Sequence, residues 1–405
     1  MKEFIDIENI NPNMKNTDKE PKKINRKKLV LLILISILSI AVIVITILYT
    51  SVTPVRQFFD KYVFRKIVSE EKLASIQLDY DSNVSIIGYN KYICILAENT
   101  LKQYQASGDL ANEIKLEISN PVYHVNNRYL AISEKNSSKI YLIADNKIMW
   151  EKKVDGNVAK IDVNRNGYVT VILTGTTHKS VIVTYDNKGN EMFKTYLSST
   201  TALDATISTD NGYLAFAEIN TAGTQIQSNI KIVSITKAKE APSDAIIYTY
   251  EAPTNSLITN IEYQNKNRLI CIYDDSIHMI SDNKDEVMLQ LQENNKKINY
   301  ADIKLTNYIY RGIEKSTGLF QADTMIEMMN IENKKQTVYT VEGVAKNIYC
   351  YDNMIAVNLG QEVEFFGTNG WLIKKYMSSQ EIHGIAITNG IAGIIYRDRV
   401  ELMNL

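Results

Sequence analysis

Residues 159–173 read AKIDVNRNGYVTVIL, and the pattern of this stretch is repeated along most of the chain. A short run with every second residue apolar leads into the polar residues 164–167, and a more apolar run leaves them. Asn and Gly tolerate the left-handed backbone conformation that a tight hairpin requires. The stretch is therefore predicted to form two antiparallel strands joined by a turn.

The same pattern occurs eight times, each time with Asn at or beside the turn. The other seven copies are VSIIGYNKYICIL (84–96), VYHVNNRYLAIS (122–133), DATISTDNGYLAFA (204–217), TNIEYQNKNRLICIY (259–273), ADIKLTNYIYRGI (301–313), KNIYCYDNMIAVN (346–358) and IHGIAITNGIAGII (382–395). A repeat at a steady period is typical of propellers and solenoids.

A second element follows several copies and contributes two more strands. It reads KIYLIADNKIMWEKKV (139–154), VIVTYDNKGNEMFKTY (181–196), HMISDNKDEVMLQL (278–291) and EVEFFGTNGWLIKKY (362–376). Four strands in roughly 40 residues are the size of a propeller blade. We expect an all-β, eight-bladed β-propeller over 74–405; seven blades stay open, because the units between 220 and 336 are long and irregular.

The two ends of this region complete each other. Residues 382–405 stop after a third strand, and ASIQLDY (74–80) is a strand without a blade of its own. Placing 74–80 in the last blade closes the ring and removes exposed sheet edges. Ile76 and Leu78 are therefore predicted to pair with the last strands of the chain.

Residues 29–50, LVLLILISILSIAVIVITILYT, contain no charged side chain. A helix of this length crosses the roughly 30 Å hydrocarbon core of a bilayer. A cleavable signal peptide is the rival interpretation, but it has a shorter apolar region and a small-x-small cleavage site. The exit YTSVTPVRQFF (49–59) lacks such a site, which favours an uncleaved transmembrane helix.

The residues before this helix predict its orientation. Residues 1–28 carry a net charge of +3, with a basic cluster at 22–28, and the rest of the chain carries −4. The positive-inside rule favours a cytoplasmic, disordered tail (1–28) and a propeller outside the cell membrane, although Arg56, Lys61, Arg65 and Lys66 make the asymmetry modest. The faintly acidic body predicts no nucleic-acid partner.

Residues 51–73 form a juxtamembrane segment or linker. Phe58, Phe59, Tyr62, Val63 and Ile67 are spaced for one helical face, among several basic residues. Such a helix either lies on lipid headgroups or packs against the following domain, and the sequence leaves both alternatives open.

Two turns resemble those of a known superfamily. DNKG…MF (186–193) and NGW (369–371), with Trp150 in the matching place, resemble degenerate repeats of the quinoprotein-like propellers, in which a Gly turn and a strand Trp help blades dock. This chain keeps only Trp150 and Trp371, so no quinone cofactor is expected. The whole arrangement resembles an uncharacterised family of membrane-anchored, WD40-like propellers from low-GC Gram-positive bacteria, which supplies no activity and no site residues.

One segment matches the opening of a calcium loop. Residues 162–167 read DVNRNG, but the twelfth position, which should be a bidentate Glu, is Leu173. Because the segment coincides with the turn of a repeat, a hairpin is the better interpretation.

The titratable residues give a few candidates and no catalytic motif. His124 and His383 fall on innermost strands, where they could line a central channel with Tyr123 and Asp162. Single polar residues packed between blades are the alternative. His178 and His278 are scattered without metal-ligand spacing, Asp79/Asp81 and Asp274/Asp275 are expected to form turns, and Cys94, Cys271 and Cys350 are expected to fill the core.

The sequence therefore predicts no catalytic, cofactor-binding or metal-binding residues, and no enzyme. The expected function is a binding or scaffolding module at the cell envelope, with an envelope protein or glycan as partner. The alternative is a glycan hydrolase or lyase that uses carboxylates at the propeller channel.

Overall fold

The computed structural model describes residues 26–64, 66–69, 73–79, 83–291, 297–318 and 321–405. The chain divides into two compact units, residues 1–65 and 66–405. Most of the predicted cytoplasmic tail, residues 1–25, and Asp81 lie outside the described residues, so the predictions for them stay untested.

The first unit contains the apolar helix α1 (Arg26–Ser51). Its segment Val30–Ser51 is long and apolar enough to cross a membrane, since 22 residues rising 1.5 Å each span roughly 33 Å. Apolar side chains are exposed along the whole helix, from Val30 to Leu48. A membrane anchor and a signal sequence both have this character.

After α1 the chain forms helix α2 (Thr53–Phe58) and the single π-helical turn η1 (Phe59–Val63). This segment packs on the end of α1: the Tyr49 hydroxyl donates a hydrogen bond of 2.7 Å to Asp60, and its ring lies 5.7 Å from that of Phe64. The helical structure ends well before residue 73. The prediction that Ile67 continues the helical face is therefore wrong.

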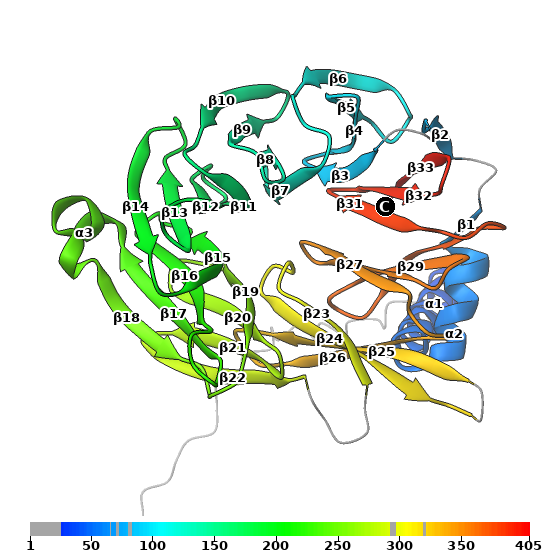
Figure 1. Cartoon of the computed structure of the whole chain (residues 1–405). Coiled ribbons are helices and arrows are strands. Elements are labelled where there is room, and N and C mark those ends of the chain that lie inside the picture. Colours follow the sequence, from blue (N-terminus) through cyan, green and yellow to red (C-terminus); the bar gives the residue numbers. More distant parts are fainter. Residues whose placement is uncertain (1–25, 65, 70–72, 80–82, 292–296, 319–320) are drawn as a thin grey trace, which may run out of the picture. The chain divides into compact units, whose positions relative to one another are not determined.

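The second unit contains eight four-stranded antiparallel blades, which confirms the eight-bladed propeller (Figure 1). Blades 1 and 2 consist of β3 (Ser85–Tyr89), β4 (Tyr92–Ala97), β5 (Thr100–Tyr104) and β6 (Leu110–Lys115), and of β7 (Pro121–Asn126), β8 (Tyr129–Glu134), β9 (Lys139–Ala144) and β10 (Lys147–Lys153). Blades 3 and 4 consist of β11 (Asn157–Val163), β12 (Val169–Thr174), β13 (Ser180–Tyr185) and β14 (Glu191–Leu197), and of β15 (Thr201–Ile207), β16 (Tyr213–Asn220), β17 (Gln227–Ser234) and β18 (Ile246–Glu251).

The remaining blades continue this order around the ring. Blades 5 and 6 consist of β19 (Ile258–Tyr263), β20 (Arg268–Tyr273), β21 (Ser276–Ser281) and β22 (Lys284–Gln290), and of β23 (Lys297–Asp302), β24 (Tyr308–Ser316), β25 (Ala322–Asn330) and β26 (Gln336–Val341). Blade 7 consists of β27 (Asn347–Tyr351), β28 (Met354–Asn358), β29 (Glu362–Gly367) and β30 (Leu372–Met377), and blade 8 of β31 (Gly384–Thr388), β32 (Ile391–Ile395), β33 (Arg399–Asn404) and β2 (Ala74–Gln77).

Three short elements were not predicted. Blade 7 carries a fifth strand, β1 (Ile67–Ser69), which pairs in parallel with β30. Blade 4 has a helix, α3 (Ile235–Glu240), and a 3₁₀ turn (Pro242–Asp244) between its third and fourth strands. These short helical turns form an insertion within the all-β fold that was predicted for 74–405.

Buried side chains join each blade to the next. The described residues form eight apolar clusters, each shared by two consecutive blades, and one of them joins blade 8 to blade 1 through Ile93, Ile95, Val400 and Leu402. A fully buried aliphatic side chain contributes roughly 1.5–3 kcal/mol. The core is therefore distributed between the blades around the ring.

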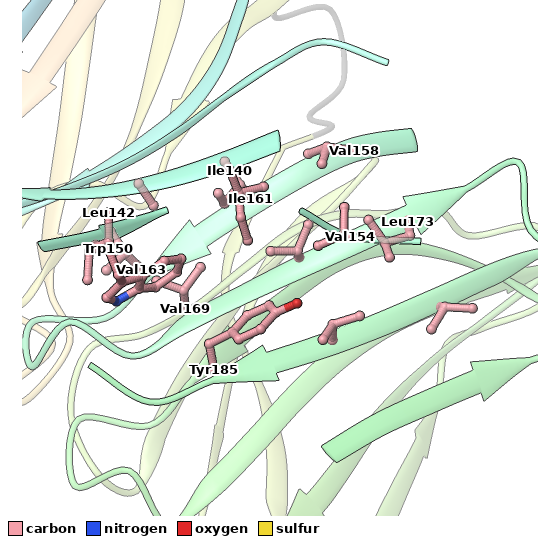
Figure 2. Packing of buried hydrophobic residues seen from close by; sticks show 14 residues of the cluster. Ile140, Leu142, Trp150, Val154, Val158, Ile161, Val163, Val169, Leu173 and Tyr185 are labelled. Atoms are coloured by element: carbon pink, nitrogen blue, oxygen red, sulfur yellow. The ribbon is translucent and has the colours of Figure 1, made fainter. Parts of the chain in front are cut away.

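Blades 2 and 3 show how two blades dock (Figure 2). Trp150 of β10 is 8 % exposed and packs 5.7 Å from the ring of Tyr185. Gly189, in the turn after β13, has φ +79°, and a Cβ there would lie 2.9 Å from Trp150 Cγ. The Gly189 turn therefore packs on Trp150 across the two blades, whereas Trp371 is 46 % exposed.

The predicted closure of the ring is confirmed. Strand β2 pairs antiparallel with β33, with Ile76 opposite Val400, and Leu78 N–H donates to the Asp398 carbonyl at 2.8 Å. On the other side of blade 8, Gly88 of β3 approaches β31 so closely that a Cβ would lie 2.1 Å from the Ile387 oxygen.

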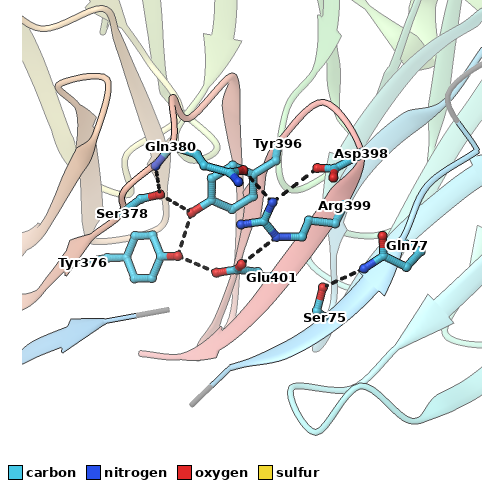
Figure 3. Close-up of polar contacts among 9 residues, drawn as sticks. All are labelled: Ser75, Gln77, Tyr376, Ser378, Gln380, Tyr396, Asp398, Arg399 and Glu401. Atoms are coloured by element: carbon cyan, nitrogen blue, oxygen red, sulfur yellow. Dashed lines mark hydrogen bonds and ion pairs between the residues drawn. The ribbon is translucent and has the colours of Figure 1, made fainter. Parts of the chain in front are cut away.

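A buried polar network lies beside this closing strand (Figure 3). Tyr376 of blade 7 hydrogen-bonds to Glu401 and, at 2.6 Å, to Tyr396. The Arg399 guanidinium donates to Glu401 at 2.8 Å and stacks over the Tyr396 ring. Glu401 is 4 % exposed, so its carboxylate depends on these partners.

Candidate functional site: the central cavity

The inner strands of blades 3 to 6 share a β-bulge. The register shifts before Lys160, Asp204, Asn260 and Tyr300 in β11, β15, β19 and β23. A bulge adds one residue and re-aims the side chains that follow it. Two residues after these positions stand Asp162, Thr206, Glu262 and Asp302, so three of the four blades place a carboxylic acid at the same point of the inner strand.

A cavity of about 820 Å³ lies among the inner strands. Residues early in these strands make it apolar, including Ile86, Ile348 and Ile385, and residues in the turns make it polar. The polar turn residues are Asn127, Arg165, Gln264, Lys304, Thr306, Asp352 and Asn389. Between the two zones lie His124, Glu262 and Asp302.

His124 is held by Asp162 of the next blade. Its Nδ1 lies 2.9 Å from Asp162 Oδ1. Burial lowers the pKa of His124, but the Asp162 and Glu262 carboxyls raise it more, to about 9. The imidazole is therefore cationic at neutral pH and neutralises Asp162.

Glu262 has no such partner among the described residues. Burial is the main factor that raises its pKa, and Asp162 and Asp302 raise it further. His124 and Lys304 lower it, and the resulting pKa is about 7. Glu262 therefore exchanges a proton near neutral pH.

The neighbours of Glu262 on blade 6 are also incompletely paired. Asp302 accepts a hydrogen bond of 2.7 Å from the Ile303 N–H. Lys304 is exposed in the following turn and makes no ion pair with the described residues. The cavity thus has one carboxyl group with a pKa of about 7 beside a second carboxyl group and an exposed lysine.

Asp204 connects neighbouring blades through its carboxylate. Its carboxylate accepts from Lys160 Nζ at 2.8 Å and from the Ile261 N–H at 2.9 Å. Burial raises the pKa of Asp204, and Lys160 opposes this. These two contacts link blade 4 to blades 3 and 5.

The structure brings three of the four predicted channel residues together. Tyr123 and His124 line the cavity, and Asp162 contacts His124. His383 is exposed just before β31 and is absent from the cavity lining, so its prediction is wrong. Glu262, Asp302 and Lys304 were missed, although the aligned segments KIDVN, NIEYQ and YADIK contain the acid at one shared position.

The calcium-like segment is a hairpin, as expected. Asn164 Oδ1 accepts hydrogen bonds from the N–H groups of Asn166 and Tyr168, at 2.9 and 3.1 Å, and so stabilises the turn between β11 and β12. Leu173 is buried in β12. Asp162, which would be the first ligand of a calcium loop, contacts His124 instead.

Blade 5 contains a serine–histidine–aspartate chain that the sequence did not reveal. Ser276 Oγ lies 2.9 Å from His278 Nε2, and His278 Nδ1 lies 2.8 Å from Asp285. Ser276 is 4 % exposed, and its hydroxyl also donates to Asp275 at 2.6 Å. A nucleophile must present its oxygen to a substrate, so these contacts fasten the turn between β20 and β21. Asp274 accepts from the Leu257 N–H at 3.0 Å, as expected of a turn former.

The cysteines are free thiols. Cys94 and Cys271 are buried, as expected, and Cys350 is half-buried at the cavity wall. Burial raises the pKa of all three thiols. They are therefore poor nucleophiles at neutral pH.

Solved structures resemble this fold at low sequence identity. Sqt1 from Chaetomium thermophilum, in a structure bound to the N-terminus of the ribosomal protein L10, is 9 % identical with a TM-score of 0.51 over 82 % of this chain and 100 % of that chain. BamB from Moraxella catarrhalis is 12 % identical with a TM-score of 0.49 over 82 % of this chain and 99 % of that chain. Identities this low indicate a shared fold alone.

No curated protein matches the sequence significantly. The profile of a family of unknown function, DUF5711, matches residues 64–405, from the end of the first unit to the last residue of the sequence. The chain therefore belongs to the DUF5711 family.

Proposed function

We propose that this protein is a binding module anchored in a bacterial cell membrane, whose propeller receives part of an envelope protein in its central cavity. The observation that carries the proposal is a set of charged side chains in that cavity that form no ion pair with the described residues, among them Glu262, Asp302 and Lys304. A concave site with a few convergent polar groups is the usual form of a binding site.

The anchor is the second part of the proposal. Helix α1 stays uncleaved in the membrane, with residues 1–28 in the cytoplasm and the propeller outside. Cysteine labelling tests this, because the three native thiols are buried or half-buried and react slowly. Glu113→Cys, on the exposed face of β6, should be labelled by a membrane-impermeant maleimide in intact cells, and Lys15→Cys should be labelled only after lysis. Labelling in the reverse order would refute the orientation, and a mature protein beginning after residue 51 would refute the anchor.

Cross-linking in membranes tests the partner. The full-length protein is cross-linked in cells, purified in detergent, and the captured proteins are identified by mass spectrometry. The matched bait carries Glu262→Gln and Lys304→Gln, which preserve side-chain size and remove the charges. A partner recovered by the wild-type bait and lost with the variant supports the proposal. Equal recovery would place the partner elsewhere, and recovery of no envelope partner would overturn the binding function.

One observation favours a second function, an envelope glycan hydrolase or lyase. Glu262, with a pKa of about 7, lies near the carboxyls of Asp302 and Asp162. Neighbouring carboxyl groups can divide the acid and base roles of glycan cleavage. Purified protein incubated with cell-wall polysaccharide should then release reducing ends, and Glu262→Gln should abolish the release. No release above that of the variant would exclude this alternative for the polymer tested.

A further inference from the structure

The charges of the cavity are unevenly matched. His124 neutralises Asp162 at 2.9 Å. Two cations lie near Glu262: His124, which is already paired with Asp162, and Lys304, which is exposed and forms no ion pair with Glu262 or Asp302. The other two charged residues of the cavity, Arg165 and Asp352, have opposite charges and lie in its turns. The middle of the cavity therefore has an unfilled place for one positive charge.

The surroundings of Glu262 make its ionised form unfavourable unless a cation is bound beside it. Glu262 is half-buried in the cavity wall, and this burial is the main factor that raises the pKa of its carboxyl group. An ionised carboxylate in such a place lacks the solvation of water and is stabilised mainly by a cation. A bound cation would therefore favour the ionised form and release the proton.

The neighbouring groups fit an organic cation better than a metal ion. No three His, Cys, Asp or Glu side chains among the described residues converge as metal ligands do. An ammonium group needs only two carboxylates and benefits from an aromatic face. Tyr123 lines the same cavity and is 42 % exposed, so its ring is available for such a contact.

The distance from the turns to the carboxylates indicates which kind of ligand could place an ammonium group beside them. Gln264 lies in the turn after β19, and Glu262 lies two residues before it in the same lining segment, roughly 6–7 Å away at the rise of a strand. A lysine side chain, with its four-carbon stem, has a reach of about 6 Å. The turns that line the cavity carry Asn127, Thr306 and Asn389, which can hydrogen-bond a peptide backbone.

We infer that the cavity takes a lysine side chain of a protein partner, with its ammonium group between Glu262 and Asp302 and the partner's backbone at the turns. This inference rests on the proposed binding function and specifies its ligand. Lys304 is then an internal competitor, because its own ammonium group is attracted to the same two carboxylates.

Calorimetric titration of the full-length protein in detergent micelles tests this inference. The probe is the peptide acetyl-Gly-Lys-Gly-amide, and its control is the same peptide with norleucine, which keeps the stem and loses the charge. Glu262→Gln should weaken binding of the lysine peptide at least tenfold at pH 8.5, and Asp302→Asn should weaken it less. Lys304→Gln should strengthen it severalfold. The matched control, Glu113→Gln on the outer strand β6, should leave it unchanged.

The pH dependence of the peptide affinity distinguishes binding at Glu262 from nonspecific electrostatic attraction. Binding requires ionised Glu262, so the affinity should fall about tenfold between pH 8 and pH 6 in the wild type, and it should be flat in Glu262→Gln. The inference would be overturned if the norleucine peptide bound equally well, or if Glu262→Gln kept the wild-type affinity. It would also be overturned if glucosamine, a cationic sugar, bound more tightly than the lysine peptide. If the peptide does not bind while cross-linking still recovers a cavity-dependent partner, the lysine inference fails and the proposed function stands.

Discussion

Replacing Gly189 by alanine tests whether the blades dock through the turn observed at Trp150. The substitution adds a Cβ that would lie 2.9 Å from Trp150 Cγ and 3.0 Å from its Cδ2. Gly390 is the matched control, because its φ of +76° is close to the +79° of Gly189 and a Cβ there meets nothing within 4 Å. Both variants bear the same backbone penalty, and only Gly189→Ala meets the neighbouring blade.

The two costs can be separated. An alanine in the left-handed region costs roughly 1–2 kcal/mol, and this is all that Gly390→Ala should lose. Carbon atoms in contact prefer about 3.5–4.0 Å, so Trp150 must shift by more than half an ångström. Overpacking of this kind costs typically 1–3 kcal/mol. Gly189→Ala should therefore lose about 1–3 kcal/mol more than the control.

Tryptophan fluorescence during urea unfolding measures this difference. The chain has only two tryptophans, and Trp371 is 46 % exposed, so Trp371→Phe in all samples leaves Trp150 as the reporter of the interface between blades 2 and 3. The midpoint should be lowest for Gly189→Ala, intermediate for Gly390→Ala and highest for the parent. Equal midpoints for the two glycine variants would refute the docking contact.

Three further predictions follow from the ring seam and the cavity. Gly88→Ala should destabilise the propeller more than Gly189→Ala, because its Cβ would meet the Ile387 carbonyl oxygen at 2.1 Å; a melting temperature within 1–2 °C of the wild type, measured by calorimetry, would contradict the close approach. Tyr376→Phe should cost about 1–3 kcal/mol in urea unfolding, since it leaves the buried Glu401 carboxylate short of a donor, and an unchanged midpoint would show that the network adds no stability. The stability of the wild type should fall as the pH rises from about 4.5 to about 7, because folded Glu262 keeps a proton that the unfolded chain releases. It should fall further between 6.5 and about 9, because folded His124 keeps its proton; Glu262→Gln should remove the first part of this loss, and an unaltered pH profile in that variant would contradict the raised pKa.

The repeat made the ring predictable from the sequence. Asn90, Asn127, Asn211 and Asn307 have positive φ values between 54° and 62°, as the hairpin turns required. The closure of the ring was predictable because residues 382–405 lack a fourth strand and residues 74–80 form a strand without a blade of its own. Such local signals suffice, because each blade is one supersecondary unit that buries its faces only against its neighbours.

The cavity was less predictable, because its geometry depends on the bulges. A bulge depends on pairing with the next strand and leaves no fixed residue signature, so the direction of Glu262 and Asp302 could not be deduced from alternation. Strand β1 was missed for a similar reason: it has three residues and depends on pairing with a strand about 300 residues away. His383 was misplaced because the strand that follows it starts one residue later.

Hydrogen exchange of the closing strand tests most directly whether the ring and its cavity exist as described. The amides of residues 74–78 should exchange as slowly as those of β33 (Arg399–Asn404), and both segments should lose protection together as urea is added, because β2 is hydrogen-bonded to β33. If residues 74–78 exchanged as fast as an unstructured linker while β33 stayed protected, the closed propeller would be contradicted.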